Sequence, residues 1–209
     1  MKHIYTLPEA EVKLTELTGI ESKIEINASL ADSANSLAKE LPTKKWTLRD
    51  NIIRFFVTSD GTTGKEWIKR LEDKGINIGH WAEDVLRSKD FKPTKTKYEI
   101  AVIKGSLFTQ EYPTTEEIRD KAKELKFKIS NAEVACLIRE LLTDKDIEEM
   151  GLWWITTFHK PIKDSVGDPE LLNAYRNGDG SWLGTSFGQP DNGWDRGHGF
   201  AFVVSQVEL

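Results

Sequence analysis

The spacing of apolar residues predicts helices in the first half of the chain. Apolar side chains recur at helical spacing over residues 48–56, 64–74 and 78–87. Thr47 would cap the first of these helices, and Gly75 would end the second. Because each segment carries a single apolar stripe, the stripes must cover one another. The pattern therefore predicts a small helical bundle.

Residues 1–90 form the first predicted region. Its opening 45 residues are mostly polar and hold two short apolar series at helical spacing, which are Val12, Leu14 and Leu17, and then Leu30, Ala34, Leu37 and Leu41. The last helix of the region would bury Trp81, Val85 and Leu86. We interpret residues 1–90 as a helical N-terminal region that could mediate oligomerisation or attachment, followed by a linker rich in Lys, Pro and Thr at residues 91–96.

The second region, residues 97–209, begins with a strand. Alternating apolar residues predict this strand over residues 98–104. Two helices follow, and each begins with a capping box, one at residues 114–117 and the other at residues 130–133. Cys136 would lie inside the second helix as a small apolar side chain. A short helical turn at residues 143–150 completes this part, closed by Gly151.

Two further strands are predicted near the end of the chain. Aromatic and β-branched residues predict one over residues 152–158. The other covers residues 200–204, with Phe200, Phe202 and Val204 on one face. Helices grouped between strands are typical of an α+β domain rather than of a parallel doubly wound sheet.

Between these strands lies the most unusual stretch of the chain, residues 175–200. Seven of the 15 glycines fall between Gly178 and Gly199, a density that disfavours both helix and strand. Large apolar residues are interspersed with the glycines and with short polar side chains, which is the composition of an ordered recognition loop. We therefore expect an irregular binding surface displayed on a folded scaffold.

Composition limits the classes of partner and the location. The chain has 209 residues, 38% of them apolar, and a net charge of −5, which argues against nucleic acid as the main partner. Cys136 is the only cysteine, so no intrachain disulfide and no cysteine-built zinc site can form. No apolar run is long enough for a membrane helix or typical of a cleaved signal peptide. We expect a soluble protein, cytoplasmic or displayed without a cleaved signal.

The order of elements from residue 97 onward resembles the C-type-lectin-like fold, in which the first and last strands pair. The C-terminal tail is also similar to the variable proteins of diversity-generating retroelements, which use that fold. The matching residues are Arg176, Asn177, Trp182, Leu183, Trp194, Gly199, Phe200 and Phe202. The resemblance covers residues 97–209 and implies a ligand-binding module with variable surface positions.

A second resemblance concerns calcium. Gln189-Pro190-Asp191 is similar to the motif with which galactose-type C-type lectins bind calcium and sugar together, and Asn192 follows it. Amide and carboxylate oxygens suit Ca²⁺, and a cis Pro190 would aim the flanking oxygens the same way. The family's second ligand group is absent, because residues 202–204 occupy its place. A Pro-Asp-Asn-Gly turn without metal is the alternative interpretation.

Other candidate chemistry is weaker. Residues 61–65 resemble a phosphate-binding loop, but Ser59 and Glu66 stand where that motif needs Gly and Ser or Thr. His159, at the end of a strand, is interpreted as a structural residue. Asp191 and Asp195 could serve glycoside hydrolysis only if a cleft brought them to ~5–9 Å of each other.

We therefore predict a non-enzymatic module that binds a protein or glycan, with no cofactor except possible calcium at Gln189, Asp191 and Asn192. The alternatives are a hydrolase that uses loop carboxylates and a calcium-dependent lectin. The predicted ligand-binding residues are Tyr175, Arg176, Asn177, Asp179, Ser181, Ser186, Phe187, Asp191, Asn192, Trp194, Asp195, Arg196 and His198.

The tryptophans are assigned separately. Trp182 would anchor the loop, and Trp194 would be at least partly available to a ligand. Trp153 and Trp154 would point to opposite faces of their strand, so that one belongs to the core and the other lies beneath a loop or helix.

Overall fold

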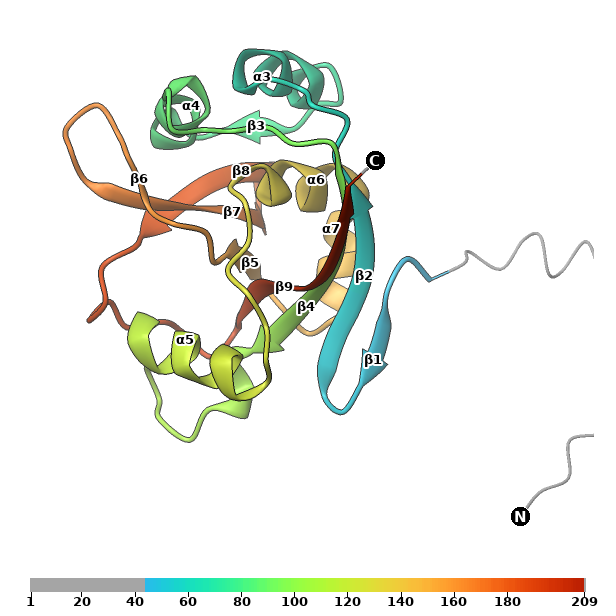
Figure 1. The fold of residues 1–209 in the computed structure, drawn as a ribbon, viewed down its shortest axis with the longest axis vertical. Coiled ribbons are helices and arrows are strands. Elements are labelled where there is room, and N and C mark those ends of the chain that lie inside the picture. The colour runs from blue at the N-terminus through green and yellow to red at the C-terminus, as the bar shows by residue number, and fades with distance from the viewer. Residues whose placement is uncertain (1–43, 209) are drawn as a thin grey trace, which may run out of the picture. The chain divides into compact units, whose positions relative to one another are not determined.

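Figure 1 shows the fold of the protein in a computed structural model, which describes residues 44–208. These residues lie in one compact unit that combines a large mixed sheet with five α-helices, so the α+β class is confirmed. The helices predicted before residue 44, and the role proposed for that segment in oligomerisation, lie outside the described residues. Within residues 44–208, no helix is long and apolar enough to cross a membrane.

The elements follow one another along the whole described chain. The helices are α3 (Gly64–Glu72), α4 (His80–Arg87), α5 (Thr115–Glu124), α6 (Glu133–Leu141) and α7 (Asp144–Glu149), with a short 3-10 turn, η1 (Gly105–Leu107). The strands are β1 (Thr47–Arg49), β2 (Ile52–Thr58), β3 (Asn77–Ile78), β4 (Thr96–Lys104), β5 (Trp154–Thr157), β6 (Ile162–Lys163), β7 (Pro169–Asn177), β8 (Gly180–Phe187) and β9 (His198–Glu208).

One sheet joins all of these strands. Its order is β1-β2-β4-β9-β5-β7-β8-β3, with β6 paired to β7. The central strands β4 and β9 are antiparallel and pair from Thr96 with Glu208 to Lys104 with Gly199. The pairing expected between the first strand after residue 97 and the last strand is thus confirmed. Strand β5 runs parallel to β9 and antiparallel to β7.

Helices cover both faces of the sheet (Figure 1). The larger core lies on the face that bears Ile100 and Val203, where α3, α4 and α6 pack. The smaller core lies on the opposite face, where Ile118 of α5 packs with Phe200 and Phe202. Successive side chains of a strand point to opposite faces, so each central strand contributes to both cores.

A buried carboxylate joins the helices of the larger core to the loops beside them. Glu133, the first residue of α6, is fully buried. Its Oε2 atom accepts the Ser59 hydroxyl at 2.7 Å and the Thr94 backbone N–H at 2.9 Å. Its Oε1 atom accepts the indole N–H of Trp67 in α3 at 3.1 Å. Each of these bonds satisfies a charged group that would be costly to bury alone.

The capping box predicted at residues 130–133 is therefore wrong. Glu133 turns inward to the core instead of back to Ser130, and its own N–H donates to the Asn131 side chain at 2.9 Å. The N–H of Ser130 donates to the carbonyl of Phe158 at 3.0 Å. The other capping box is confirmed, because Thr114 and Glu117 exchange side-chain and backbone bonds at the start of α5.

The helix predicted over residues 48–56 is also wrong. This segment forms the β1–β2 hairpin, whose two turn residues, Asp50 and Asn51, have φ angles of 53° and 62°. Positive φ at both positions is typical of a tight hairpin turn, and Asp and Asn tolerate it. Ile53, Phe55 and Val57 face the core at period two. The apolar residues of the segment fit both periods, and pairing with β4 selects the strand.

Residues 44–90 do not form a separate bundle. Strand β2 pairs with β4 along its whole length, across the predicted linker, and Phe91 of that linker is buried. Helices α3 and α4 confirm the predictions over residues 64–74 and 78–87, and Gly75 follows α3 with a φ of 71°. Trp81, predicted to be buried, is 40% exposed.

The irregular surface predicted over residues 175–200 is mostly wrong. Strands β7 and β8 form a hairpin over residues 169–187, and within residues 175–200 only the hairpin turn at 178–179 and residues 188–197 lie outside the strands. At position 184 the strand accepts glycine where a larger residue would clash, because a Cβ atom there would lie 2.6 Å from the Tyr175 ring on β7. That glycine makes room for a neighbouring aromatic side chain rather than breaking the strand.

We predict that Glu133→Gln lowers the free energy of unfolding by about 3 kcal/mol. The amide NH₂ of glutamine would face the donors of Ser59 and Thr94, and the charge that strengthens these bonds would be lost. Urea denaturation at pH 7 measures the effect. The control, Glu124→Gln on the exposed face of α5, should change stability by less than about 0.5 kcal/mol. Equal midpoints for the two variants would contradict the role assigned to the buried carboxylate.

Candidate functional site

The sequence-predicted site residues divide between a hairpin and a loop. The β7–β8 hairpin carries Tyr175, Arg176, Asn177, Asp179, Ser181, Ser186 and Phe187. Residues 188–197 carry Gln189, Asp191, Asn192, Trp194, Asp195 and Arg196, and β9 begins with His198. The hairpin and the start of β9 bring some of these residues together on one face of the sheet.

Four aromatic side chains lie side by side across four neighbouring strands, and we call them the aromatic row. They are His198 of β9, Trp154 of β5, Tyr175 of β7 and Trp182 of β8. Trp154 is paired in register with both His198 and Tyr175, and Tyr175 is paired with Trp182. Directly opposed residues point to the same face of a sheet, so the register itself places these rings in contact.

The rings of the row are stacked. The Trp154 ring lies 4.4 Å from Tyr175 and 5.2 Å from His198 between centroids, with interplanar angles of 11° and 13°. Tyr175 and Trp182 are 5.9 Å apart at 15°. All four side chains are half-buried. Because the ring faces meet one another, the edges of the inner rings are the parts that reach solvent.

The polar atoms of the row are held in place. The indole N–H of Trp182 donates to Asn177 Oδ1 at 3.1 Å, and the same oxygen accepts the N–H of Asp179. Burial lowers the pKa of His198, an effect partly offset by the carboxylate of Asp195. Burial, and then Asp179, raise the pKa of Tyr175. Both rings are therefore neutral near pH 7, and the row presents an uncharged surface.

A second aromatic group lies on the opposite face at the same end of the sheet. Trp153 is 57% exposed, and the guanidinium carbon of Arg176 lies 4.7 Å from its ring centroid. Arg176 also approaches Glu148 of α7 at 3.6 Å. Trp153 and Trp154 do point to opposite faces, as predicted, but neither lies in the core. Neither was predicted as a site residue, because the strands that flank them are set by long-range pairing.

An ion pair between a buried arginine and a half-buried aspartate supports the hairpin from behind. Arg139 of α6 donates to the backbone carbonyl of Tyr175 at 3.1 Å and pairs with Asp144 at 2.9 Å. Asp144 in turn accepts the hydroxyl of Ser181 at 2.8 Å. These contacts fix both strands of the hairpin relative to α6 and α7, so Ser181 holds the scaffold together.

The roles predicted for Trp182 and Trp194 are reversed in the structure. Trp194 is only 2% exposed, and its indole N–H donates to Thr115 at 2.8 Å within the smaller core. Trp182 is the half-exposed ring of the pair. Two other predicted residues are also displaced from the row: Ser186 accepts the Asn173 amide at 2.8 Å, and Phe187 lies at the far end of β8.

The loop predicted to bind calcium packs against the start of α5. The carbonyl oxygens of Pro190 and Asn192 accept the N–H groups of Glu116 and Thr115 at 3.1 and 3.0 Å. No peptide bond in residues 44–208 is cis, so the cis Pro190 prediction is wrong. In the same residues no three His, Cys, Asp or Glu side chains converge as metal ligands.

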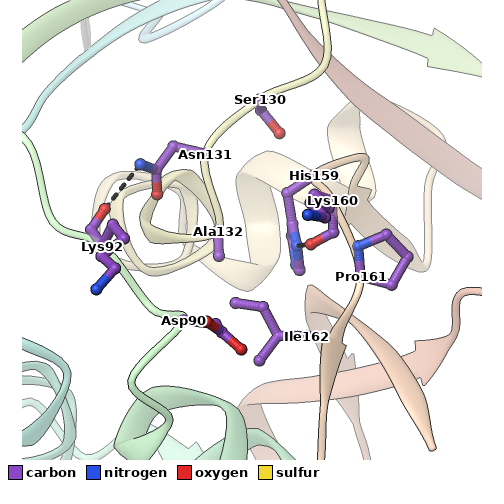
Figure 2. A pocket seen from close by; sticks show the side chains of 9 residues that line it. All are labelled: Asp90, Lys92, Ser130, Asn131, Ala132, His159, Lys160, Pro161 and Ile162. Carbon is purple, nitrogen blue, oxygen red and sulfur yellow. Dashed lines mark hydrogen bonds between the residues drawn. The ribbon is translucent and has the colours of Figure 1, made fainter.

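Figure 2 shows a pocket of about 380 Å³ elsewhere on the molecule, between the start of α6 and residues 159–162. Its charged side chains are Asp90, Lys92 and Lys160, and none of the predicted site residues lines it. His159, which also lines the pocket, is almost fully buried. The charged groups belong to exposed side chains.

The His159 ring has a structural role, as predicted. Its Nδ1 atom lies 2.7 Å from the Lys160 carbonyl oxygen, and its Nε2 atom accepts the N–H of Leu172 at 3.0 Å. A carbonyl only accepts and an N–H only donates, so Nδ1 carries the proton and the ring is neutral. Burial, more than the nearby Arg119, lowers the pKa of His159 to about 4.

We predict that His159 makes the fold less stable in acid. Its pKa is about 4 in the folded protein and near 6.5 in the unfolded chain, so stability is lost as pH falls from 6.5 to 4. The loss amounts to about 3 kcal/mol. An imidazole NMR titration with a midpoint near 4 is the expected result, with His159→Gln identifying the resonance. A midpoint near 6.5 would contradict the buried neutral ring.

Comparison with protein-family models, with curated proteins and with solved structures found no match for this chain. No family is therefore shown by similarity.

Proposed function

We propose that this protein is a non-enzymatic recognition module that binds a protein or glycan through one end of its sheet. The proposed surface consists of the aromatic row on one face, the Trp153–Arg176 pair on the other, and the turn between β7 and β8. The observation that carries this proposal is the row itself. Four half-exposed rings stand in register across four strands and are not absorbed into either core.

The physical chemistry of the row suits binding. Tyrosine and tryptophan have few rotatable bonds and offer a large contact area at low entropic cost. Stacked neighbours and the hydrogen bond from Trp182 to Asn177 restrict the rings further. Ordering side chains on association is a main cost of binding, and a preorganised surface avoids much of it. Trp, Tyr and Arg are also the residues most often found at the energetic centres of interfaces.

The resemblance to the C-type-lectin-like variable proteins supports the same proposal. Strand β4, helices α5 and α6, strand β5 and strand β9 follow the expected order, and β4 pairs with β9. The present chain adds the β1–β2 hairpin and β3 to that sheet. In this proposal the domain is lectin-like, and its variable positions would be the exposed side chains near the row.

Hydrolysis and calcium-dependent sugar binding are less well supported. Asp195 Oδ1 accepts the N–H of Gly197 at 2.6 Å in a local turn, and Asp191 is exposed. The oxygens of the Gln189–Asn192 loop that have partners are backbone carbonyls. Those of Pro190 and Asn192 accept N–H groups of α5, and that of Gln189 accepts the N–H of Asn192. No observation in residues 44–208 places two carboxylates across a cleft.

We predict that Trp153→Ala and Trp182→Ala each weaken capture of the partner at least tenfold, because truncating a central aromatic residue costs about 2 kcal/mol of binding energy. The measurement is affinity capture from cells that express the protein, compared between tagged wild type and variants. Melting curves must show that the variants remain folded.

Phe56→Ala serves as the matched control. Phe56 is an aromatic residue with 59% exposure in β2, outside the proposed surface. It should retain capture. Loss with Phe56→Ala but not with the two tryptophan variants would place the binding surface elsewhere and refute the proposal.

Diversification predicts a distinct pattern in the gene. If the protein is a variable protein, codons for exposed positions such as Asp179, Asp191 and Asp195 differ among individual cells. Codons for Trp194 and Phe200 stay fixed, because both side chains are buried in the smaller core. Sequencing the 3′ end of the gene in many cells measures this. Uniform codons at all five positions would show that the surface has a single form.

A further inference from the structure

The aromatic row ends beside a pocket at the edge of the sheet. Trp182 is its outermost ring, and the last strand, β3, pairs with β8 through Asn77 opposite Trp182. The pocket has a volume of about 380 Å³ and is lined by Trp182, Glu72 and residues 75–78. It therefore extends the proposed binding surface beyond the row.

Trp182 forms part of the wall of this pocket. One face of its indole stacks on Tyr175 at 5.9 Å with an interplanar angle of 15°. The opposite face is turned toward β3, where Asn77 is its register partner. The indole N–H is held by Asn177, so the ring is fixed in this orientation. A planar group could continue the stack there.

The pocket also carries one charged side chain. Glu72, at the end of α3, is exposed and is the only charged side chain among the residues that line it. Among residues 44–208, no ion pair or side-chain hydrogen bond involves Glu72, whereas its neighbour Asp73 pairs with Lys69. The Asn77 amide adds a polar group that makes only a long contact, 3.5 Å, to the carbonyl of Asp179.

At two other places in this protein an arginine side chain lies between an indole and a carboxylate. Arg70 stacks over Trp67 at 4.5 Å and forms two bonds, of 2.7 and 2.6 Å, with Glu140. Arg176 stacks over Trp153 at 4.7 Å and approaches Glu148. In both places a planar guanidinium uses its face for the ring and its edge for the carboxylate.

We propose that the Trp182–Glu72 pocket binds an arginine side chain of a protein partner. Arginine fits better than lysine because its guanidinium is planar and can stack while it donates to the carboxylate. The carboxylate of Glu72 and the indole of Trp182 line the same pocket and are complementary to a planar cation, and the protein itself carries a net charge of −5. This inference rests on the proposed recognition function and specifies the partner group at one end of the same surface.

The test uses N-acetylarginine amide as the probe and the full chain as the protein. The indole N–H resonance of Trp182, identified with Trp182→Phe, is followed by NMR during titration. We expect a saturable shift that is weakened about fivefold in Glu72→Gln, the loss expected for one exposed ion pair. Asp73→Asn, next in sequence but not lining the pocket, should bind the probe as the wild type does.

N-acetylcitrulline amide, which has the same shape without the charge, should produce little shift. Equal binding of citrulline, equal binding by Glu72→Gln, or a shift caused by a methyl glycoside instead of the arginine probe would each overturn the proposal. If the arginine probe fails while Trp182→Ala still loses partner capture, only the arginine assignment is refuted. If capture survives both tryptophan substitutions, the recognition function itself is refuted.

Discussion

The structure depends on one buried charge. Glu133 lies at the start of α6, where it receives donors from three separate parts of the chain: Ser59 after β2, Trp67 in α3 and Thr94 before β4. A carboxylate in an apolar core is stable only when its oxygens are fully bonded. The sheet edge, the helical layer and the connection to β4 must therefore adopt one arrangement together. This requirement explains why residues 44–96 belong to the same unit as the rest of the described chain.

The proposed binding surface depends on this scaffold in two steps. Helix α6, positioned by Glu133, carries Arg139, which bonds the backbone of Tyr175 and pairs with Asp144. The β7–β8 hairpin is thereby fixed against the helices. The register of β5, β7, β8 and β9 then places Trp154 between His198 and Tyr175. The stacked row follows from sheet pairing, so its rigidity comes from the core and not from a loop.

Structural features that depend on local sequence could be predicted. The Thr114 capping box, the glycine after α3 and the strand of alternating residues at 98–104 depend on neighbours within a few residues, and all three are confirmed. Features that depend on contacts between residues far apart in the sequence could not be predicted. Residues 48–56 fit a helix and a strand equally well until β4 pairs with β2. Glu133 has the spacing of a capping residue, and only the three-dimensional arrangement brings Ser59, Trp67 and Thr94 to it.

The residues of the candidate site could also be predicted only in part. The sequence predicted Tyr175 and His198 as ligand-binding residues, and the structure brings them into one row. It did not predict Trp154 between them, because that contact needs the register of three strands. The roles predicted for Trp182 and Trp194 were reversed for a related reason. The exposure of each ring depends on distant parts of the chain: Trp194 packs in the smaller core under α5, where Thr115 accepts its N–H.

Site-specific photo-crosslinking would test the central claim most directly. A benzophenone amino acid placed at Asp179, Phe56 or Ile129 samples three exposed positions. Only the first, in the turn between β7 and β8, lies on the proposed surface, and both tryptophans of that surface stay in place. Irradiation in cells should attach a partner to the protein labelled at position 179 and not to the other two. Crosslinks to the same partner from position 56 or 129, with none from position 179, would contradict the account.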